Sequence, residues 1–163
     1  MFPFRRILFP TDFSACALEA LPKACELASV SRAALVLVHV LPVEPPTPWD
    51  VPPYADFGLA VMPESEYRLR LEQEVGRRLA ALAVEHLPAE LERVLVIKSG
   101  DPAREIVATA AEQRCDLIMM ATHGWAGWRH LVFGSVAEKV LRESDRPVLV
   151  IKGAAPAAGT PRT

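Results

Sequence analysis

The chain alternates short, uniformly apolar runs with longer segments whose apolar residues recur every three or four positions. The apolar runs are residues 5–10, 33–41, 93–98, 116–121 and 146–152. Short runs rich in Val, Ile and Leu are typical of strands that are buried on both faces, as in parallel sheets. The pattern therefore predicts a sheet of five strands.

Amphipathic segments follow the first four runs, and three of them carry start signals of a helix. Ser14 is placed to cap the first segment through its hydroxyl. Asp101, followed by proline at the first helical position, is placed to cap the third. Ser135 and Glu138 have capping-box spacing, so Ser135 is the predicted N-cap of the last helix.

The order of these elements predicts the fold class. Strands alternate with amphipathic helices, which indicates an α/β fold with an open, doubly wound, parallel five-stranded sheet and helices on both faces. In such sheets ligands bind beyond the carboxyl ends of the strands, near the point where strand order reverses. Candidate site residues are therefore those that directly follow a strand.

Two segments do not fit the alternation. Residues 42–63 contain seven prolines, a density that excludes a helix or a central strand, and they are predicted to form a long irregular insertion. A helical pattern then covers residues 64–87. The tail, residues 153–163, has no periodicity and is predicted to be disordered. We expect one domain over residues 1–152.

Composition narrows the class of protein. The chain has 163 residues, of which 51% are hydrophobic and 23% charged, as expected for one globular domain. A net charge of −2 gives no reason to expect nucleic acid or a membrane surface as a partner. No apolar run approaches the roughly 20 residues of a membrane span. We therefore expect a cytoplasmic protein.

The three cysteines, Cys16, Cys25 and Cys115, form neither a CxxC pair nor a metal-ligand spacing. We expect buried, unpaired thiols.

The stretch ATHGWAGWRHLVFGSV, residues 121–136, is the richest in candidate chemistry. It follows the fourth predicted strand and leads into the last helix, and it holds three glycines. Glycine lets a backbone approach a ligand closely, and a helix N-terminus offers N–H groups to an anion. The standard phosphate signatures GxxxxGK[ST] and GxGxxG are absent. By spacing alone, the glycines serve equally well in turns and close packing.

The spacing Ala121, Gly124, nine residues, Gly134, Ser135 resembles the G-x-x-G-x9-G-[ST] motif of the universal stress protein family, in its ATP-binding branch. Similar segments are ILFPTDFS, LVLVHVL, SGDPAREIV, CDLIMMATHG and GSVAEKVLRESDRPVLVIK, so the resemblance covers residues 4–152. It implies a Rossmann-like fold of the adenine nucleotide alpha hydrolase type.

The resemblance also implies an adenine nucleotide site, residue by residue. The adenosine part would lie beside Pro10, Thr11 and Asp12, with Val40 at the adenine. The ribose side would be lined by Met120, Ala121 and Thr122. The phosphates would be held by Gly124, Gly134, Ser135 and Val136. His123, as a residue that fixes the loop, and Gly127 complete the predicted cofactor-binding set.

Three positions depart from the family's pattern. Ala121 stands where the first glycine of the motif is usual; a methyl group fits there if φ is negative and clashes if φ must be positive. Trp125 and Trp128 replace smaller or basic residues, and can stack on a ring, cover the loop or pack against a partner.

His39, at the end of the second strand, is expected to be a structural histidine with a satisfied hydrogen bond.

The resemblance implies a homodimeric, regulatory stress-response protein that binds ATP, or AMP or ADP, with or without Mg. It also implies dimerisation through the last strand, residues 147–152. An interaction protein of the same fold without nucleotide, and a very slow ATPase, are the alternatives. We expect no enzyme, because no general base with an orienting partner stands out and Asp12 alone is a candidate.

Overall fold

The computed structural model describes residues 4–41, 64–122 and 134–152. Along the chain the elements are β1 (Arg6–Pro10), α1 (Ala15–Ser31), β2 (Ala34–Leu41), α2 (Glu64–His86), β3 (Arg93–Ser99), α3 (Pro102–Glu112), β4 (Leu117–Thr122), α4 (Ser135–Glu143) and β5 (Val148–Lys152). The Pro-rich insertion, most of the glycine-rich stretch and the tail lie outside the described residues.

The five strands form one sheet in the order β3-β2-β1-β4-β5, and each neighbouring pair is parallel. This confirms the predicted α/β class. The chain builds outward from β1 to β2 and β3, then crosses to the other side of β1 to form β4 and β5. Strand order therefore reverses beside β1, which places the expected ligand-binding crevice at the carboxyl ends of β1 and β4.

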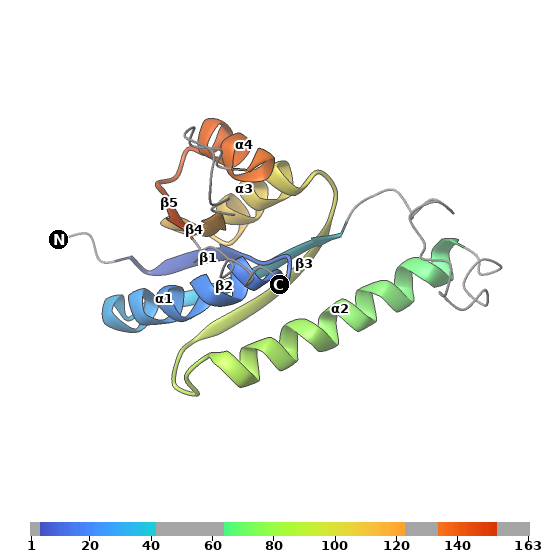
Figure 1. Ribbon diagram of the computed structural model, residues 1–163, viewed down its shortest axis with the longest axis horizontal. Coiled ribbons are helices and arrows are strands. Elements are labelled where there is room, and N and C mark those ends of the chain that lie inside the picture. The colour runs from blue at the N-terminus through green and yellow to red at the C-terminus, as the bar shows by residue number, and fades with distance from the viewer. Residues whose placement is uncertain (1–3, 42–63, 123–133, 153–163) are drawn as a thin grey trace, which may run out of the picture.

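Two helices cover each face of the sheet: α1 and α2 lie on one side, and α3 and α4 on the other (Figure 1). Alternation along β1 sets this division, because successive side chains of a strand point to opposite faces. Ile7 and Phe9 pack under α1 and α2, whereas Leu8 packs under α3 and α4. All three are fully buried.

The predicted N-cap residues are confirmed for α1 and α3, and the one predicted for α4 is wrong. The Ser14 hydroxyl accepts from the Ala17 N–H at 3.3 Å at the start of α1, and Asp101 caps α3. At α4 the N-cap is Gly134, and Ser135 is already the first helical residue, without a side-chain cap hydrogen bond. The physical reason is the backbone of Gly134, whose φ of 76° suits glycine and is not helical, so the helix begins at Ser135, one residue earlier than predicted.

No helix within the described part of the chain is both long enough and apolar enough to cross a membrane.

A candidate ligand pocket at the carboxyl edge of the sheet

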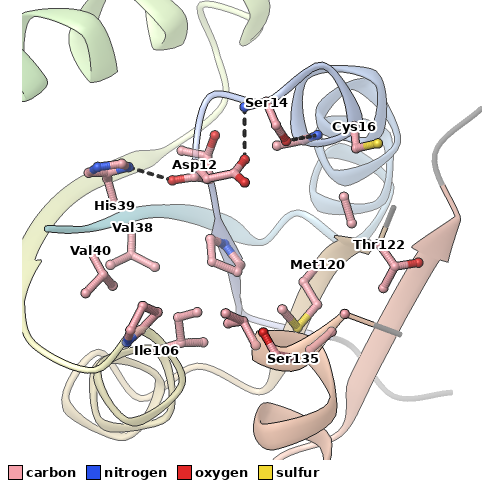
Figure 2. A pocket seen from close by; sticks show the side chains of 18 residues that line it. Asp12, Ser14, Cys16, Val38, His39, Val40, Ile106, Met120, Thr122 and Ser135 are labelled. Carbon is pink, nitrogen blue, oxygen red and sulfur yellow. Dashed lines mark hydrogen bonds between the residues drawn. The ribbon is translucent and has the colours of Figure 1, made fainter. Parts of the chain in front are cut away.

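A cavity of about 310 Å³ opens at the carboxyl ends of the central strands (Figure 2). Its walls come from the ends of β1, β2 and β4 and from the first turns of α1, α3 and α4. The volume lies at the lower end of the range for small-molecule sites. The cavity therefore lies at the edge where an open parallel sheet binds its ligands.

The structure brings most of the predicted site residues together in this cavity. Ten of them line it: Pro10, Thr11, Asp12, Val40, Met120, Ala121, Thr122, Gly134, Ser135 and Val136. His123, Gly124 and Gly127 lie outside the described residues, as do Trp125 and Trp128. Residues from three strands and one helix, up to 126 positions apart in the sequence, thus share one cavity.

The turn between β1 and α1 is fixed by hydrogen bonds to the neighbouring strand. The Thr11 N–H donates to the Val38 carbonyl at 2.9 Å. The Thr11 carbonyl accepts from Nδ1 of His39 at 2.8 Å, so Nδ1 carries the proton in this contact. His39 therefore has the hydrogen bond expected of a structural histidine, and it also lines the cavity.

Asp12 lies in this turn, and its side chain is held by the backbone. Its Oδ1 accepts from the Ser14 N–H at 2.9 Å, and the residue is exposed. In Figure 2 the carboxylate lies across the cavity from Ser135 of α4. The turn thus holds one carboxylate at a fixed place on the wall opposite α4.

Phe13, the next residue, has a φ of 60°, which a non-glycine residue adopts only when its surroundings require it. Its N–H donates to Thr11 Oγ1 at 3.1 Å. Its ring lies 4.8 Å from the His39 ring, and the guanidinium of Arg78 lies 4.5 Å from its centroid. Contacts from β2 and α2 therefore hold the strained turn that carries Asp12.

The N-terminus of α4 forms the opposite wall. Gly134, Ser135 and Val136 line the cavity, and α4 itself supplies no acceptor for the N–H groups of its first turn. Side chains cap α1 and α3, whereas no side chain of the described residues caps α4. Backbone N–H groups and the partial positive charge of a helix N-terminus make this wall suited to an anion.

Ala121, the departure from the family's motif, lies within β4, paired with Ile151 of β5. Among the described non-glycine residues, positive φ occurs at Phe13, Arg32 and Arg114, and so not at Ala121. A methyl group is therefore compatible with the backbone at this position.

Several residues of the cavity were not predicted from the sequence. Cys16, Ala17, Pro102, Ile106 and Ala137 also line it. Cys16 was expected to be buried. It is half-buried because it lies in the first turn of α1, and that turn borders the cavity. The sequence could have predicted them, because in a parallel sheet each helix begins at the edge where the preceding strand ends, so first-turn residues lie at the edge that holds the cavity.

The charges of the cavity are sparse. Its described lining holds one carboxylate, Asp12, and one imidazole, His39, but neither lysine nor arginine. The described residues contain no cluster of three or more His, Cys, Asp or Glu side chains that could hold a metal ion. Apart from these polar groups and the helix N-terminus, the walls are mostly apolar, with Val38, Val40 and Ile106 among them.

The open parallel sheet, its strand order and the cavity at its carboxyl edge place the chain among the doubly wound α/β proteins, in which ligands bind beyond the carboxyl ends of the strands. The chain belongs to the universal stress protein family: the model of that family matches residues 3–152.

Individual relatives agree with this assignment. Universal stress protein MJ0577 of Methanocaldococcus jannaschii is 31% identical over 157 residues, covering 91% of this chain and 95% of that protein. The solved structure of MJ0577 has a TM-score of 0.72 at 26% identity and covers 95% and 100% of the two chains. A universal stress protein of Thermus aquaticus is 34% identical over 149 residues, covering 91% and 99%.

The universal stress protein of Archaeoglobus fulgidus, solved in complex with dAMP, has the same fold. Its TM-score is 0.57 at 20% identity, with 93% of this chain and 100% of that chain covered.

Proposed function

We propose that this protein is a regulatory stress-response protein that binds an adenine nucleotide, ATP or its AMP and ADP relatives, in the cavity. The observation that carries the proposal is the uncapped N-terminus of α4, which opens into a cavity with otherwise mostly apolar walls. A phosphate needs N–H donors and partial positive charge, whereas a base needs a flat apolar slot.

The cavity offers a chemically suitable surface to the base, the ribose and the phosphates of a nucleotide. Val38, Val40 and Ile106 supply apolar surface for the base. Asp12, held by the Ser14 N–H, is an acceptor for the ribose hydroxyls. The backbone of Gly134–Val136 and the Ser135 hydroxyl are donors for phosphate. If Mg accompanies the nucleotide, Asp12 is the carboxylate of the described lining that can contact it, and the ion would offset phosphate charge.

Family membership supports the proposal, and the Archaeoglobus fulgidus protein, in complex with dAMP, is an instance of this fold holding an adenine nucleotide. The alternative of an interaction protein without nucleotide rests on Ala121, on Trp125 and Trp128, and on the Pro-rich insertion, of which only Ala121 lies within the described residues. The ground that rests on Ala121 is weakened because the backbone at that position accommodates alanine.

Cys16 offers a direct test of where the ligand binds. Cys16 is half-buried on the cavity wall, whereas Cys25 and Cys115 are buried. Burial raises the pKa of the Cys25 thiol and raises that of Cys115 to about 11, so both buried thiols are poor nucleophiles at pH 8. A maleimide should therefore modify Cys16 first. ATP at ten times its Kd should slow this reaction about tenfold, since ligand and reagent compete for the same space.

The Cys16→Ser variant is the control, and it should lose the fast reaction while keeping nucleotide binding. Peptide mass spectrometry assigns the modified thiol. ATP that binds without protecting Cys16 would place the ligand elsewhere on the molecule and contradict the proposed site.

We also propose a homodimer that forms through the last strand, residues 147–152. β5 is an edge strand of the sheet, and Leu149 on it is 42% exposed. An apolar edge strand invites pairing with a second copy. Sedimentation velocity over a concentration series should give the mass of two chains at micromolar concentration, and a single chain at every concentration would refute the dimer.

We propose that the protein binds ATP and does not hydrolyse it rapidly. Asp12, the carboxylate of the described cavity lining, accepts a hydrogen bond from its own turn. In-line hydrolysis of ATP needs a positioned water and neutralised charge at the γ-phosphate. The alternative is a slow ATPase, and phosphate release during incubation with ATP measures it. A slow ATPase would require that Asp12→Ala abolish phosphate release while ATP still binds.

We propose that the protein is cytoplasmic, because three unpaired thiols are typical of a reducing compartment.

A further inference from the structure

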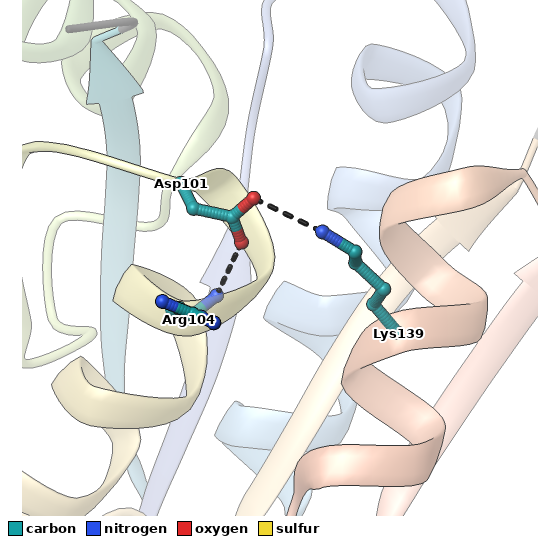
Figure 3. A network of polar contacts seen from close by, with 3 residues as sticks. All are labelled: Asp101, Arg104 and Lys139. Atoms are coloured by element: carbon teal, nitrogen blue, oxygen red, sulfur yellow. Dashed lines mark hydrogen bonds and ion pairs between the residues drawn. The ribbon is translucent and has the colours of Figure 1, made fainter.

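An ion pair joins Asp101, the N-cap of α3, to Lys139 in the second turn of α4 (Figure 3). The ammonium of Lys139 lies 3.1 Å from Asp101 Oδ2. The other oxygen of the same carboxylate, Oδ1, accepts from the Arg104 N–H at 3.1 Å and caps α3. These two bonds, the backbone one first, hold the pKa of Asp101 below its usual value.

The pair lies at the same edge of the molecule as the proposed phosphate wall. Neither Asp101 nor Lys139 lines the cavity, but each has a neighbour that does: Pro102 follows Asp101, and Ser135 is one helical turn before Lys139. Residues four apart lie on one face of a helix, about 6 Å apart along its axis, and long side chains lean toward its N-terminus. The Lys139 ammonium can therefore reach the level of the Ser135 N–H.

The described walls offer little positive charge to the phosphates of a nucleotide. A nucleoside triphosphate brings several negative charges, whereas a helix N-terminus offers roughly half a positive charge. The described lining contributes Asp12 and no lysine or arginine. Lys139 is a full positive charge on the helix that forms the proposed phosphate wall.

Another anion can also replace Asp101 as the partner of Lys139 at little cost in free energy. The side chains of Lys139 and Asp101 are 46% and 38% exposed. Exposed pairs contribute little net stability, about 0–1 kcal/mol, so a second anion can compete for the lysine.

We propose that Lys139 is a phosphate-binding residue, and that Asp101 holds its ammonium until the terminal phosphates of a bound nucleotide replace the carboxylate. The inference rests on the proposed nucleotide site and deepens it. The Asp101–Lys139 pair would then determine the preference of the site for nucleotides with two or three phosphates over adenosine and AMP.

A purely structural pair predicts a different result, which makes the inference testable. If the pair only holds α3 against α4, removing either partner loosens the cavity and weakens all ligands alike. If Asp101 competes with phosphate for Lys139, removing the carboxylate strengthens the binding of ATP. Asn is as good an N-cap as Asp, so Asp101→Asn leaves α3 capped while it releases the lysine.

The experiment measures Kd for adenosine, AMP, ADP and ATP by titration calorimetry, with wild type, Asp101→Asn, Lys139→Met and the double variant. For ATP we expect Lys139→Met to weaken binding about tenfold, as loss of a charged hydrogen bond does. Asp101→Asn should tighten ATP about threefold, with adenosine unchanged in both. The double variant should match Lys139→Met, since no lysine remains to be released.

The second ion pair of α3 is the matched control. Lys98 contacts Glu112 Oε2 at 2.6 Å, and neither residue nor its chain neighbours line the cavity. Glu112→Gln releases a lysine in the same way, and should leave every Kd unchanged.

Weaker ATP binding in Asp101→Asn, or equal losses for adenosine and ATP in Lys139→Met, would overturn the inference while the nucleotide site stands. A wild-type protein that binds none of the four ligands would overturn both.

Discussion

Ser135→Glu should abolish most of the affinity for ATP while leaving the fold as stable as before, or more so. The new carboxylate would lie at the first position of α4, where acidic residues stabilise a helix by about 0.3–1 kcal/mol. It would also face the proposed phosphates. Two unit charges about 5 Å apart near a protein surface repel by about 3 kcal/mol, which corresponds to roughly 100-fold in Kd.

Adenosine separates this effect from general damage to the cavity. It has no phosphate, so its Kd should change by no more than about twofold in Ser135→Glu. Ser135→Ala is the matched variant without the charge, and should weaken ATP only a few-fold through loss of the hydroxyl. Thermal unfolding of all three proteins without ligand measures stability. Unchanged ATP binding in Ser135→Glu would mean that phosphates do not lie at the N-terminus of α4.

Phe9→Ala should produce the largest loss of stability, about 3–5 kcal/mol in the free energy of unfolding. Phe9 is fully buried in the middle strand, and it packs among residues of α1 and α2. Its removal leaves a cavity that a strand with neighbours on both sides has little freedom to fill. Urea unfolding at fixed protein concentration measures the loss.

Leu95→Ala is the control for Phe9→Ala. Leu95 lies on the edge strand β3 and is 40% exposed, so its truncation should cost less than about 1 kcal/mol. Phe9→Leu keeps most of the apolar volume and should fall between the two, which preserves the comparison if Phe9→Ala does not fold. Equal losses at the two positions would contradict the assignment of Phe9 to the main core.

Much of the fold followed from the sequence because local patterns and tertiary structure agree. The apolar runs predicted β1 to β5 with bounds within a residue or two, since strands buried on both faces need apolar residues throughout. The cap of α4 was wrong, although Ser135 has the spacing of a capping box. That spacing does not report the backbone angles of Gly134, which shift the helix start by one residue.

The candidate site was predictable where residues follow strands, and was missed where helices begin. Asp12, Val40 and Ala121 were found from strand ends and from the family's motif. Cys16 and Pro102 were missed because only residues that directly follow a strand were predicted, although the first turn of each following helix lies at the same edge of the sheet. The Asp101–Lys139 pair joins residues 38 positions apart and became visible only with the packing of α3 on α4.

The central claim is that this cavity holds an adenine nucleotide, and titration calorimetry of the nucleotide-stripped protein with ATP, with and without Mg, tests it most directly. We expect saturable binding of one ATP per chain, weakened about 100-fold in Ser135→Glu. No saturable binding at millimolar ATP under either condition, together with unprotected Cys16, would contradict the account.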